Sequence, residues 1–452
     1  MGRVSLRSFS SLGVTDFRRL WLALLLANGG RWAFTLGISW FTYQATGSPQ
    51  WVGAVVMGSQ APALLVAPLA GTWADRWSRR RLLVTGFALG AAASAGVMAL
   101  AAQDSAPPMA LLALSLLFGG AFSMQTTLSN TMVPSLVPPG HLVNAVSLQA
   151  MAFHGSQLLG SALATPLLVT RGPQAIFGLC LALYSLAAWL GSRVQGGERR
   201  VEPAAAPALP ELAEAGTMAF LRDGLRYVTR QPLLTALLSM VTLHCGLSMS
   251  YMGILPHFAA RVLGGDRATY SSMMMAVGLG SVTGTMGLAR GVRGSLQGVL
   301  YLLTGMASGL SLVAVASAGL VPWKVPWAMA MATSIGLSQA MFMALSQAWS
   351  VGTAPDPVRG RVASFFSMLA TGAMAAGNWA FGAVAERWDP AAVMAGMGLA
   401  FAAVTAGLCR WWGPLQSVCS RGEQAVWQRP LAPAAAASAA AAGGRCPSLR
   451  PS

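Results

Sequence analysis

Arg31 is a charged residue inside a long apolar run, and its neighbours suggest that it binds an anion. The run extends over about residues 20–43, and four of its members recur at i, i+3, i+4 and i+7, namely Asn28, Arg31, Trp32 and Thr35. A helix would place these four on one face. An unpaired charge in hydrocarbon costs at least about 2.5–3.5 kcal/mol, so Arg31 needs a cavity or a polar partner. We expect this face to attract a carboxylate or phenolate; a structural arginine that bonds to carbonyls or extends along the helix is an equal alternative.

Proton transfer inside an apolar run would require a titratable group there, and two histidines are the candidates. All 13 Asp and Glu residues fall in loops, in the linker, in the tail or at the ends of apolar runs. His154 and His244 lie within such runs. The unperturbed pKa of histidine, about 6.5, suits a proton switch. The alternative for each is a histidine that is hydrogen-bonded between helices, which is the commoner role.

Other polar side chains recur inside the apolar runs at spacings that suit one helix face. Each could contact a ligand in a cavity, although a hydrogen bond between helices is the commoner role for such residues. With Asn28, Arg31, His154 and His244, the candidate binding set includes Gln125, Gln149, Tyr251 and Gln339.

The composition is that of a polytopic membrane protein. The chain has 452 residues, of which 55% are hydrophobic and 9% charged, with a mean hydropathy of +0.57. A helix needs about 20 apolar residues to cross the hydrocarbon of a bilayer. Twelve runs of this kind occur, at roughly 20–43, 51–70, 82–103, 109–133, 143–169, 174–195, 232–259, 270–290, 296–320, 325–350, 361–385 and 390–412. We therefore predict an all-α protein of twelve transmembrane helices.

The positive charge is distributed unevenly between the two sides that these spans define. The net charge is +16, and 23 of the 29 basic residues fall in segments on the same side as the N-terminus. Loops rich in arginine and lysine stay in the cytoplasm. We expect a multi-pass protein of the inner (cell) membrane with both termini in the cytoplasm, and a nucleic-acid partner is not needed to explain the charge.

The chain divides into two similar halves. We predict a cytoplasmic N-terminal segment (1–19), a six-helix bundle (20–195), a linker rich in Pro and Gly (196–231), a second six-helix bundle (232–412) and a disordered tail (413–452). Shifting the first half by 217 residues superimposes Pro138 on Pro355 and Gly160 on Gly377. Two pseudo-symmetric bundles are expected to enclose a cavity near the midplane of the membrane.

The five cysteines show no paired spacing, so neither a disulfide framework nor a thiolate metal site is indicated. We expect no cofactor and no metal. A phosphate-binding loop would need a lysine, and the one lysine, Lys324, lies in a loop on the outer side. An ATP-driven pump is therefore excluded, and the lack of a buried acid or metal triad argues against an enzyme.

A charged hairpin separates the second and third spans, and it resembles a signature of the major facilitator superfamily. The segment Gly71-Thr72-Trp73-Ala74-Asp75-Arg76-Trp77-Ser78-Arg79-Arg80-Arg81 is similar to the pattern G-x-x-a-D-R-x-x-R-R. The resemblance implies a gate that closes the cytoplasmic side, formed by Gly71, Asp75, Arg76, Arg79 and Arg80.

A second segment, Pro355-Asp356-Pro357-Val358-Arg359-Gly360-Arg361-Val362, resembles the P-D-x-x-R-G-R-V pattern of the branch related to enterobactin exporters and macrolide-efflux proteins. It adds Arg359 and Arg361 to the expected gate. The resemblance implies a secondary transporter that exports a small organic molecule, such as a drug or siderophore, by alternating access. Uptake of an anionic metabolite and a non-transporting sensor are the alternatives.

The chain departs from the family pattern at two places that bear on proton coupling. Gly160 is followed by Ser161 rather than the proline of the antiporter motif, and the fourth span holds no arginine. Antiport driven by a proton gradient is thus left open. We expect a monomer in the lipid bilayer with a small-molecule substrate.

Overall fold

The computed structural model describes residues 11–103, 106–195, 226, 228–289, 296–354 and 356–411. The predicted tail and most of the predicted linker and N-terminal segment lie outside this part of the chain. Within it, the protein is helical and contains no strand. The all-α prediction is confirmed.

The first half forms one bundle from seven α-helices. Their bounds are α1 (Thr15–Thr46), α2 (Pro49–Gly58), α3 (Ala63–Arg76), α4 (Arg79–Ala102), α5 (Pro108–Leu136), α6 (Leu142–Arg171) and α7 (Pro173–Ser192), with a short 3-10 turn at Pro139–His141. A turn at residues 59–62 separates α2 from α3, and together these two helices make one span. The bundle therefore has six spans.

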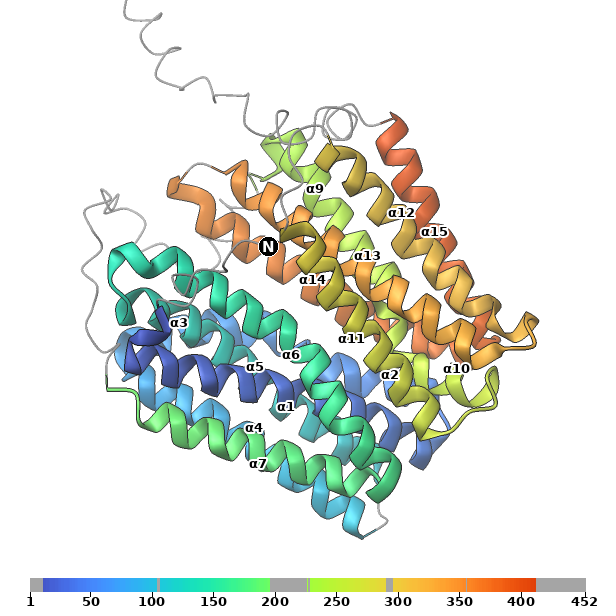
Figure 1. Cartoon of the computed structure of the whole chain (residues 1–452), viewed down its shortest axis with the longest axis horizontal. Coiled ribbons are helices and arrows are strands. Elements are labelled where there is room, and N and C mark those ends of the chain that lie inside the picture. The colour runs from blue at the N-terminus through green and yellow to red at the C-terminus, as the bar shows by residue number, and fades with distance from the viewer. Residues whose placement is uncertain are drawn as a thin grey trace, which may run out of the picture.

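The second half forms a matching bundle (Figure 1). Its helices are α9 (Pro232–Leu243), α10 (Leu255–Arg261), α11 (Arg267–Ala289), α12 (Leu296–Ala316), α13 (Lys324–Gly352), α14 (Asp356–Ala385) and α15 (Pro390–Trp411). A π-helical turn (His244–Ser248) and a 3-10 turn (Ser250–Gly253) connect α9 to α10, so this broken segment also counts as one span. The described residues thus form twelve spans in two groups of six.

The same helix pairs pack in both bundles, which is the pseudo-symmetry that the repeat predicted. Helix α4 packs on α5 and α7 in the first bundle, and α12 packs on α13 and α15 in the second. The equivalent helices α5 and α13 begin at Pro108 and Lys324, 216 positions apart and close to the offset of 217 found in the sequence. Across the molecule α2 contacts α14, and α6 contacts α11, as a two-fold relation requires.

The spans run between two ends that differ in charge. The arginine end holds Arg19, Arg79 and Arg193, where α1 and α4 begin and α7 ends. The Glu386 end holds Gly47 and Glu386, where α1 and α14 end. This separation follows from the positions of the arginines in the loops, and the topology places each loop at the end that the sequence predicted.

The contacts that join the two bundles lie between the middle of the molecule and the Glu386 end. Gly382 of α14 passes so close to α2 that a Cβ atom on it would lie 2.6 Å from the carbonyl oxygen of Pro49. A Cβ on Gly278 of α11 would lie 3.1 Å from the Cα of Leu158 in α6. Small residues of this kind allow helix backbones to approach closely in a membrane, where packing rather than the hydrophobic effect holds helices together.

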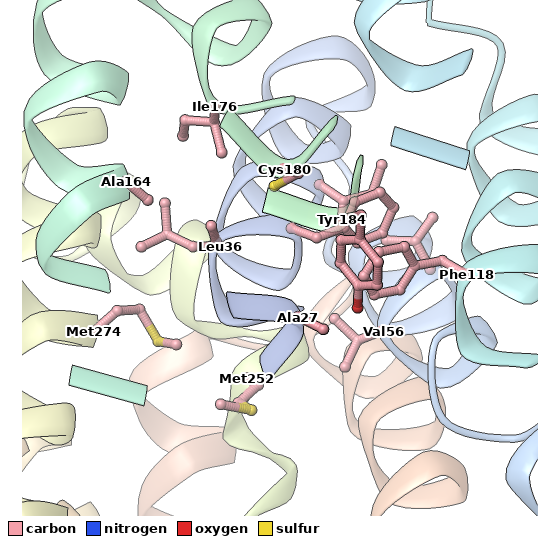
Figure 2. Close-up of a cluster of buried hydrophobic side chains, with 14 of the residues drawn as sticks. Ala27, Leu36, Val56, Phe118, Ala164, Ile176, Cys180, Tyr184, Met252 and Met274 are labelled. Atoms are coloured by element: carbon pink, nitrogen blue, oxygen red, sulfur yellow. The ribbon is translucent and has the colours of Figure 1, made fainter. Parts of the chain in front are cut away.

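The largest buried apolar cluster also crosses from one bundle to the other. It includes Leu36 and Val56 of the first bundle together with Met252 and Met274 of the second (Figure 2). Three smaller clusters belong to the second bundle alone, one of them around Tyr301 and Phe342. The apolar core therefore continues from one bundle into the other beside these glycine contacts.

Eight spans are long and apolar enough to cross a membrane by length and composition. The four others are α1, α6, α11 and α14. Helices α6, α11 and α14 lie at the seam between the bundles, where α2 contacts α14 and α6 contacts α11. Helix α1 packs against α6 and α7. Because these helices face protein on more than one side, they need less apolar surface than a helix that faces lipid. The weaker hydropathy thus follows from their central position.

The charged hairpin at residues 71–81 is shorter than the sequence pattern suggested. Helix α3 continues to Arg76 and α4 begins at Arg79, so only Trp77 and Ser78 form the turn. The hydroxyl oxygen of Ser78 accepts a hydrogen bond from the backbone N–H of Arg81 (3.4 Å), which caps α4. The signature arginines therefore occupy the end of one helix and the first turn of the next.

Candidate functional site

Arg31 lies among aromatic rings from three helices. Its guanidinium carbon is 4.6 Å from the ring centroid of Trp32 on α1, 4.5 Å from that of Phe122 on α5 and 5.6 Å from that of Phe153 on α6. Attraction between a cation and an aromatic face is worth about 0.5–2 kcal/mol per contact, and most when water is excluded. The rings therefore offset part of the cost of placing this charge in the membrane. We call Arg31, Trp32, Phe122 and Phe153 the Arg31 cage.

The cage leaves the arginine without an anionic partner. Within the part of the chain that the structure describes, no carboxylate lies within ion-pair distance of Arg31. Its Nε–H is buried and has no hydrogen-bond acceptor. Arg31 as a whole residue retains intermediate exposure. Its Nε–H is a charged donor that no described residue uses.

Two amide side chains beside the cage also have unused hydrogen-bonding groups. Asn28 lies one turn before Arg31 on α1, is 5% exposed, and its Oδ1 has no donor. Gln125 lies one turn after Phe122 on α5, is fully buried, and neither of its amide atoms has a partner among the described residues. Buried polar groups are normally paired, and leaving one unpaired costs about 1–3 kcal/mol. This part of the first bundle therefore holds polar groups that a ligand or water would satisfy.

Tyr184 of α7 fixes the helices behind the cage. The ring of Tyr184 occupies the space beside Gly30 and Gly90, where a Cβ would lie 3.0 Å and 2.6 Å from ring carbons. It also packs edge-on against Phe118, as Figure 2 shows. Glycine at these two positions allows α1 and α4 to approach the ring. The residue next to Gly30 is Arg31, so this packing sets the position of the cage.

The spacing in the sequence found part of this site and missed the rest. Asn28, Arg31 and Trp32 share a face as predicted, and Gln125 lies on the adjacent helix. Phe122 and Phe153 were not predicted. Phe122 precedes Gln125 by three positions, so a search of the same helix face for aromatic residues could have found it. Phe153 has no comparable signal.

Gln149 and Gln339 form hydrogen bonds between helices of their own bundles. The Nε2 of Gln149 donates to Asn130 Oδ1 (2.8 Å) and Ser129 Oγ (3.3 Å), which joins α6 to α5. The Nε2 of Gln339 donates to the carbonyl oxygen of Ser248 (2.9 Å), which joins α13 to the π-helical turn. These contacts match the commoner of the two roles considered for such residues.

His244 lies inside the second bundle and not beside the Arg31 cage. It is fully buried, its Nε2 is 3.1 Å from Ser308 Oγ of α12, and its ring lies against Phe342 and Phe401. This is the environment of a histidine hydrogen-bonded between helices. Tyr251 is likewise buried, at 2% exposure, in the 3-10 turn. The side chain of His154 lies outside the described residues, so its role stays a prediction.

Two arginines of the hairpin bond to carbonyl groups of their own bundle. Arg80 donates to the carbonyl oxygen of Val194, which follows α7 (3.3 Å), and Arg79 to that of Thr131 in α5 (3.5 Å). Arg76 is exposed. The side chain of Asp75 is outside the description, and Gly71 is described only as part of the α3 backbone. Arg359 and Arg361 lie in the first turns of α14, at the same end of the molecule.

At the opposite end, a carboxylate connects the two bundles. Glu386, just after α14, accepts a hydrogen bond from the Ser48 hydroxyl (2.6 Å) and a longer one from the backbone N–H of Gln50 (3.4 Å). Both donors belong to the N-terminus of α2, where a negative charge interacts favourably with the helix dipole. We call this contact the Glu386 clasp. A shallow pocket of about 380 Å³ lies beside it, lined in part by Gln50 and Arg387.

Two aromatic contacts reinforce the closure at the Glu386 end. The Tyr43 hydroxyl of α1 is 3.3 Å from Nδ1 of His257 in α10. Trp40 of α1 stacks on Tyr270 of α11, with ring centroids 5.6 Å apart. Each pair joins a residue of the first bundle to one of the second. The sequence pointed to none of the residues of this closure as functional.

The Arg31 cage presents a positive charge beside buried amide groups without partners. Within the described residues, no group of three or more His, Cys, Asp and Glu side chains gathers in a way that could hold a metal ion. The cage offers a positive charge, and the bundles offer two ends of which one is closed.

Comparison with known proteins gives the same architecture. The model of a family described as transmembrane secretion effector matches residues 6–434. The chain is 22% identical over 340 residues to the Staphyloferrin A transporter of Staphylococcus aureus (strain NCTC 8325 / PS 47), covering 75% of this chain and 82% of that protein. It is 27% identical over 331 residues to an MFS-type transporter of Sinorhizobium fredii (strain NBRC 101917 / NGR234), covering 72% and 75%.

Solved structures with the same fold include several transporters. The nucleoside transporter NupG aligns with a TM-score of 0.66 at 15% identity, covering 87% of this chain and 99% of that one. The xylose transporter XylE from E. coli aligns with a TM-score of 0.61 at 13% identity, covering 90% and 96%. At such identities the likeness concerns the fold alone.

Proposed function

We propose that this chain, which belongs to the transmembrane secretion effector family of major facilitator transporters, exports a small organic anion across the inner membrane by alternating access. That the chain is a multi-pass secondary transporter follows from the family. The direction and the substrate are our proposals. The direction rests on two pseudo-symmetric bundles sealed together at one end, and the substrate rests on Arg31.

We propose that the seal belongs to an inward-facing conformation. We place the arginine end in the cytoplasm, because basic loops remain on that side. The Glu386 end then faces outward, and its closure by the clasp, the glycine contacts and the aromatic pairs corresponds to an inward-facing state. The Arg31 cage would receive its substrate from the cytoplasm in this state, as an exporter requires.

The signature hairpin supplies the opposite closure in the proposed cycle. When the bundles rock so that the Glu386 end opens, Asp75 and the neighbouring arginines would bond to helix ends of the second bundle near Arg359 and Arg361. Arg79 and Arg80 bond within the first bundle in the present conformation. This is what an unlatched state predicts, since the arginines have then exchanged partners. Two seals that alternate would prevent the carrier from opening at both ends at once.

Arg31 supports an anionic substrate. The cage has one positive charge, no described carboxylate and unused polar groups on Asn28 and Gln125. A carrier of cations would benefit from the opposite charge. That one relative is named for a siderophore, staphyloferrin A, is in keeping with an exported organic anion. Arg31 would form the charge-assisted hydrogen bond, and the cage rings would contact the apolar part of the ligand.

Export is tested by comparing the metabolites retained by cells with and without the gene. A compound that accumulates in the deletion strain is then labelled and offered to proteoliposomes that contain the purified protein. We expect the labelled anion to cross the liposome membrane only when the protein is present. If no compound accumulates and none crosses, the chain is a sensor or scaffold with a carrier fold; movement into cells instead of out would make it an uptake carrier.

Anion selectivity is tested by Arg31→Gln, with Arg171→Gln as the matched control because Arg171 is an exposed arginine at the Glu386 end. Transport of the anion is compared with that of its neutral ester or amide. We expect Arg31→Gln to reduce anion transport by about 10- to 100-fold, as loss of a charge-assisted hydrogen bond to a desolvated group implies, and to leave the neutral analogue nearly unchanged. An unchanged ratio of the two substrates would show that Arg31 is a structural arginine.

A further inference from the structure

A group of sulfur atoms lies in the second bundle, whereas the Arg31 cage belongs to the first, and it has no part in the proposed transport. Cys245 belongs to the π-helical turn between α9 and α10. Its Sγ is 3.9 Å from the Sδ of Met249 and 3.9 Å from the Sδ of Met343 on α13. The thiol is 2% exposed, and both methionines are half-buried. We call these three residues the sulfur site.

From this geometry we propose that the sulfur site binds one soft monovalent metal ion, for which Cu(I) and Ag(I) are the probes. This inference goes beyond the proposed transport and does not depend on it. Thiolate and thioether sulfurs are the protein ligands that select Cu(I) among the metals of the cell.

The sulfur–sulfur distances suit a metal ion held by three ligands. Metal–thiolate bonds are about 2.3 Å long, so three sulfurs arranged as a triangle around one ion lie roughly 4.0 Å apart. Both distances from the Cys245 sulfur, 3.9 Å, are close to this value. The thiol therefore already lies at the required spacing from each methionine. Methionine is also flexible enough to make the remaining adjustment.

The charge of the site favours a monovalent ion over a divalent one. On binding, the Cys245 S–H bond breaks, its proton leaves to solvent, and a sulfur–metal bond forms. One thiolate and two neutral thioethers with a +1 ion make an uncharged complex. A +2 ion such as Zn²⁺ would leave one net positive charge buried in the membrane interior, which is costly without a partner. The sulfur ligands and the apolar surroundings therefore both favour a soft monovalent ion.

The backbone at Cys245 departs from a regular helix. The π-helical turn spans His244–Ser248, and the carbonyl oxygen of Cys245 accepts a hydrogen bond from the Ser250 hydroxyl (2.8 Å) rather than serving only the helix ladder. Turns of this kind are rare and occur frequently at functional sites. The turn also brings the sulfur of Cys245 toward α13, so an ion bound there would tie the broken span to α13.

The test uses the full-length protein in which the other four cysteines, Cys180, Cys409, Cys419 and Cys446, are replaced by serine, so that Cys245 is the single thiol. Cu(I) is supplied without oxygen as its complex with a coloured chelator, and binding is read from the loss of colour. We expect one equivalent of Cu(I) per chain. Ag(I) should also protect Cys245 from alkylation by N-ethylmaleimide.

Three variants in this background separate a site from a lone thiol. Cys245→Ser should weaken Cu(I) binding by on the order of 100-fold, and Met343→Leu or Met249→Leu by on the order of tenfold, since a ligand is lost in each. Leucine conserves the volume of methionine, so the packing is retained, and thermal stability is measured to check this. Met286→Leu, an exposed methionine of α11, is the matched control and should bind as the parent does.

Two outcomes would overturn the proposal. The first is a single-thiol protein that removes no Cu(I) from the chelator and is not protected from alkylation by Ag(I). The second is equal Cu(I) affinity in the parent and the two methionine variants, which would show that the thiol alone binds the ion and that the methionines are ordinary core residues.

Discussion

The closed seam between α2 and α14 can be opened by adding a single methyl group. Gly53 of α2 faces the carbonyl oxygen of Asn378 in α14, and a Cβ on Gly53 would overlap that atom. Gly253, at the end of the 3-10 turn, also packs against this position: a Cβ on Gly253 would lie 3.0 Å from the Cα of Gly53. Because the obstruction is backbone and not a flexible side chain, no rotamer change relieves it. Gly53→Ala therefore requires the helices to part by roughly 1 Å.

The size of the effect follows from the cost of overpacking. Forcing an extra carbon into a close-packed contact costs about 1–3 kcal/mol, and this cost falls only on the conformation in which the seam is closed. A coupling of that size shifts a two-state equilibrium by roughly 5- to 150-fold. The gain in helix propensity from glycine to alanine, at most about 1 kcal/mol, applies to both conformations because α2 is helical in each, so it cancels.

The shift can be measured by double electron–electron resonance between spin labels at Gln103 and Lys324, which are exposed residues of different bundles at the Glu386 end. Gly53→Ala should add a longer distance to the distribution and slow transport, because the inward-facing state becomes less populated. Gly396→Ala is the matched control: Gly396 lies in α15, and a Cβ there would meet no atom within 4 Å. If Gly53→Ala kept both the distances and the transport rate of the parent, the seam would not be the outer seal.

Further predictions concern the two seals and the histidines. Glu386→Gln removes the negative charge at the N-terminus of α2. It should therefore raise the population with the longer label distance by about two- to fivefold. A shift of the same size at high salt would argue against the dipole interaction. Asp75→Asn should favour the inward-facing state and lower transport without much loss of protein, and full activity would contradict the cytoplasmic latch. His244→Gln should lower thermal stability but keep any proton dependence of transport, because the ring bonds to Ser308 within the bundle. His154→Gln combined with His244→Gln tests a histidine relay, and unchanged proton-driven uptake into vesicles would exclude it.

The sequence predicted most of the fold because a transmembrane helix can be recognised from the length and polarity of an apolar run. Apolar runs of the required length give the spans, and arginines in the loops give the two ends. The offset of 217 residues gave the pairing of the halves, which the positions of α5 and α13 confirm. Lipid allows few alternatives to a helix, so length and polarity are enough at this level. The breaks in the second and seventh spans were not predicted, since tertiary contacts determine where a helix adopts a tight or π-helical turn.

The candidate site was predictable only where its residues share one helix. Asn28, Arg31 and Trp32 could be grouped by the helical period. Phe122 and Phe153 come from other helices, and no spacing relates them to Arg31. The same limit explains why the sequence could not decide the role of His244, which we considered as a candidate for proton transfer. Only the packing of α12 against the broken span shows that this histidine bonds to Ser308.

What the sequence alone determined is therefore the number of spans, their division into two repeats, the charged end and the presence of an arginine within the first span. The tertiary structure decided which end is closed, which backbones meet at glycines, and which side chains from separate helices surround Arg31 or bring sulfur atoms together at Cys245. The physical reason is that hydrophobicity and charge act along the chain, residue by residue, whereas close packing depends on which helices become neighbours.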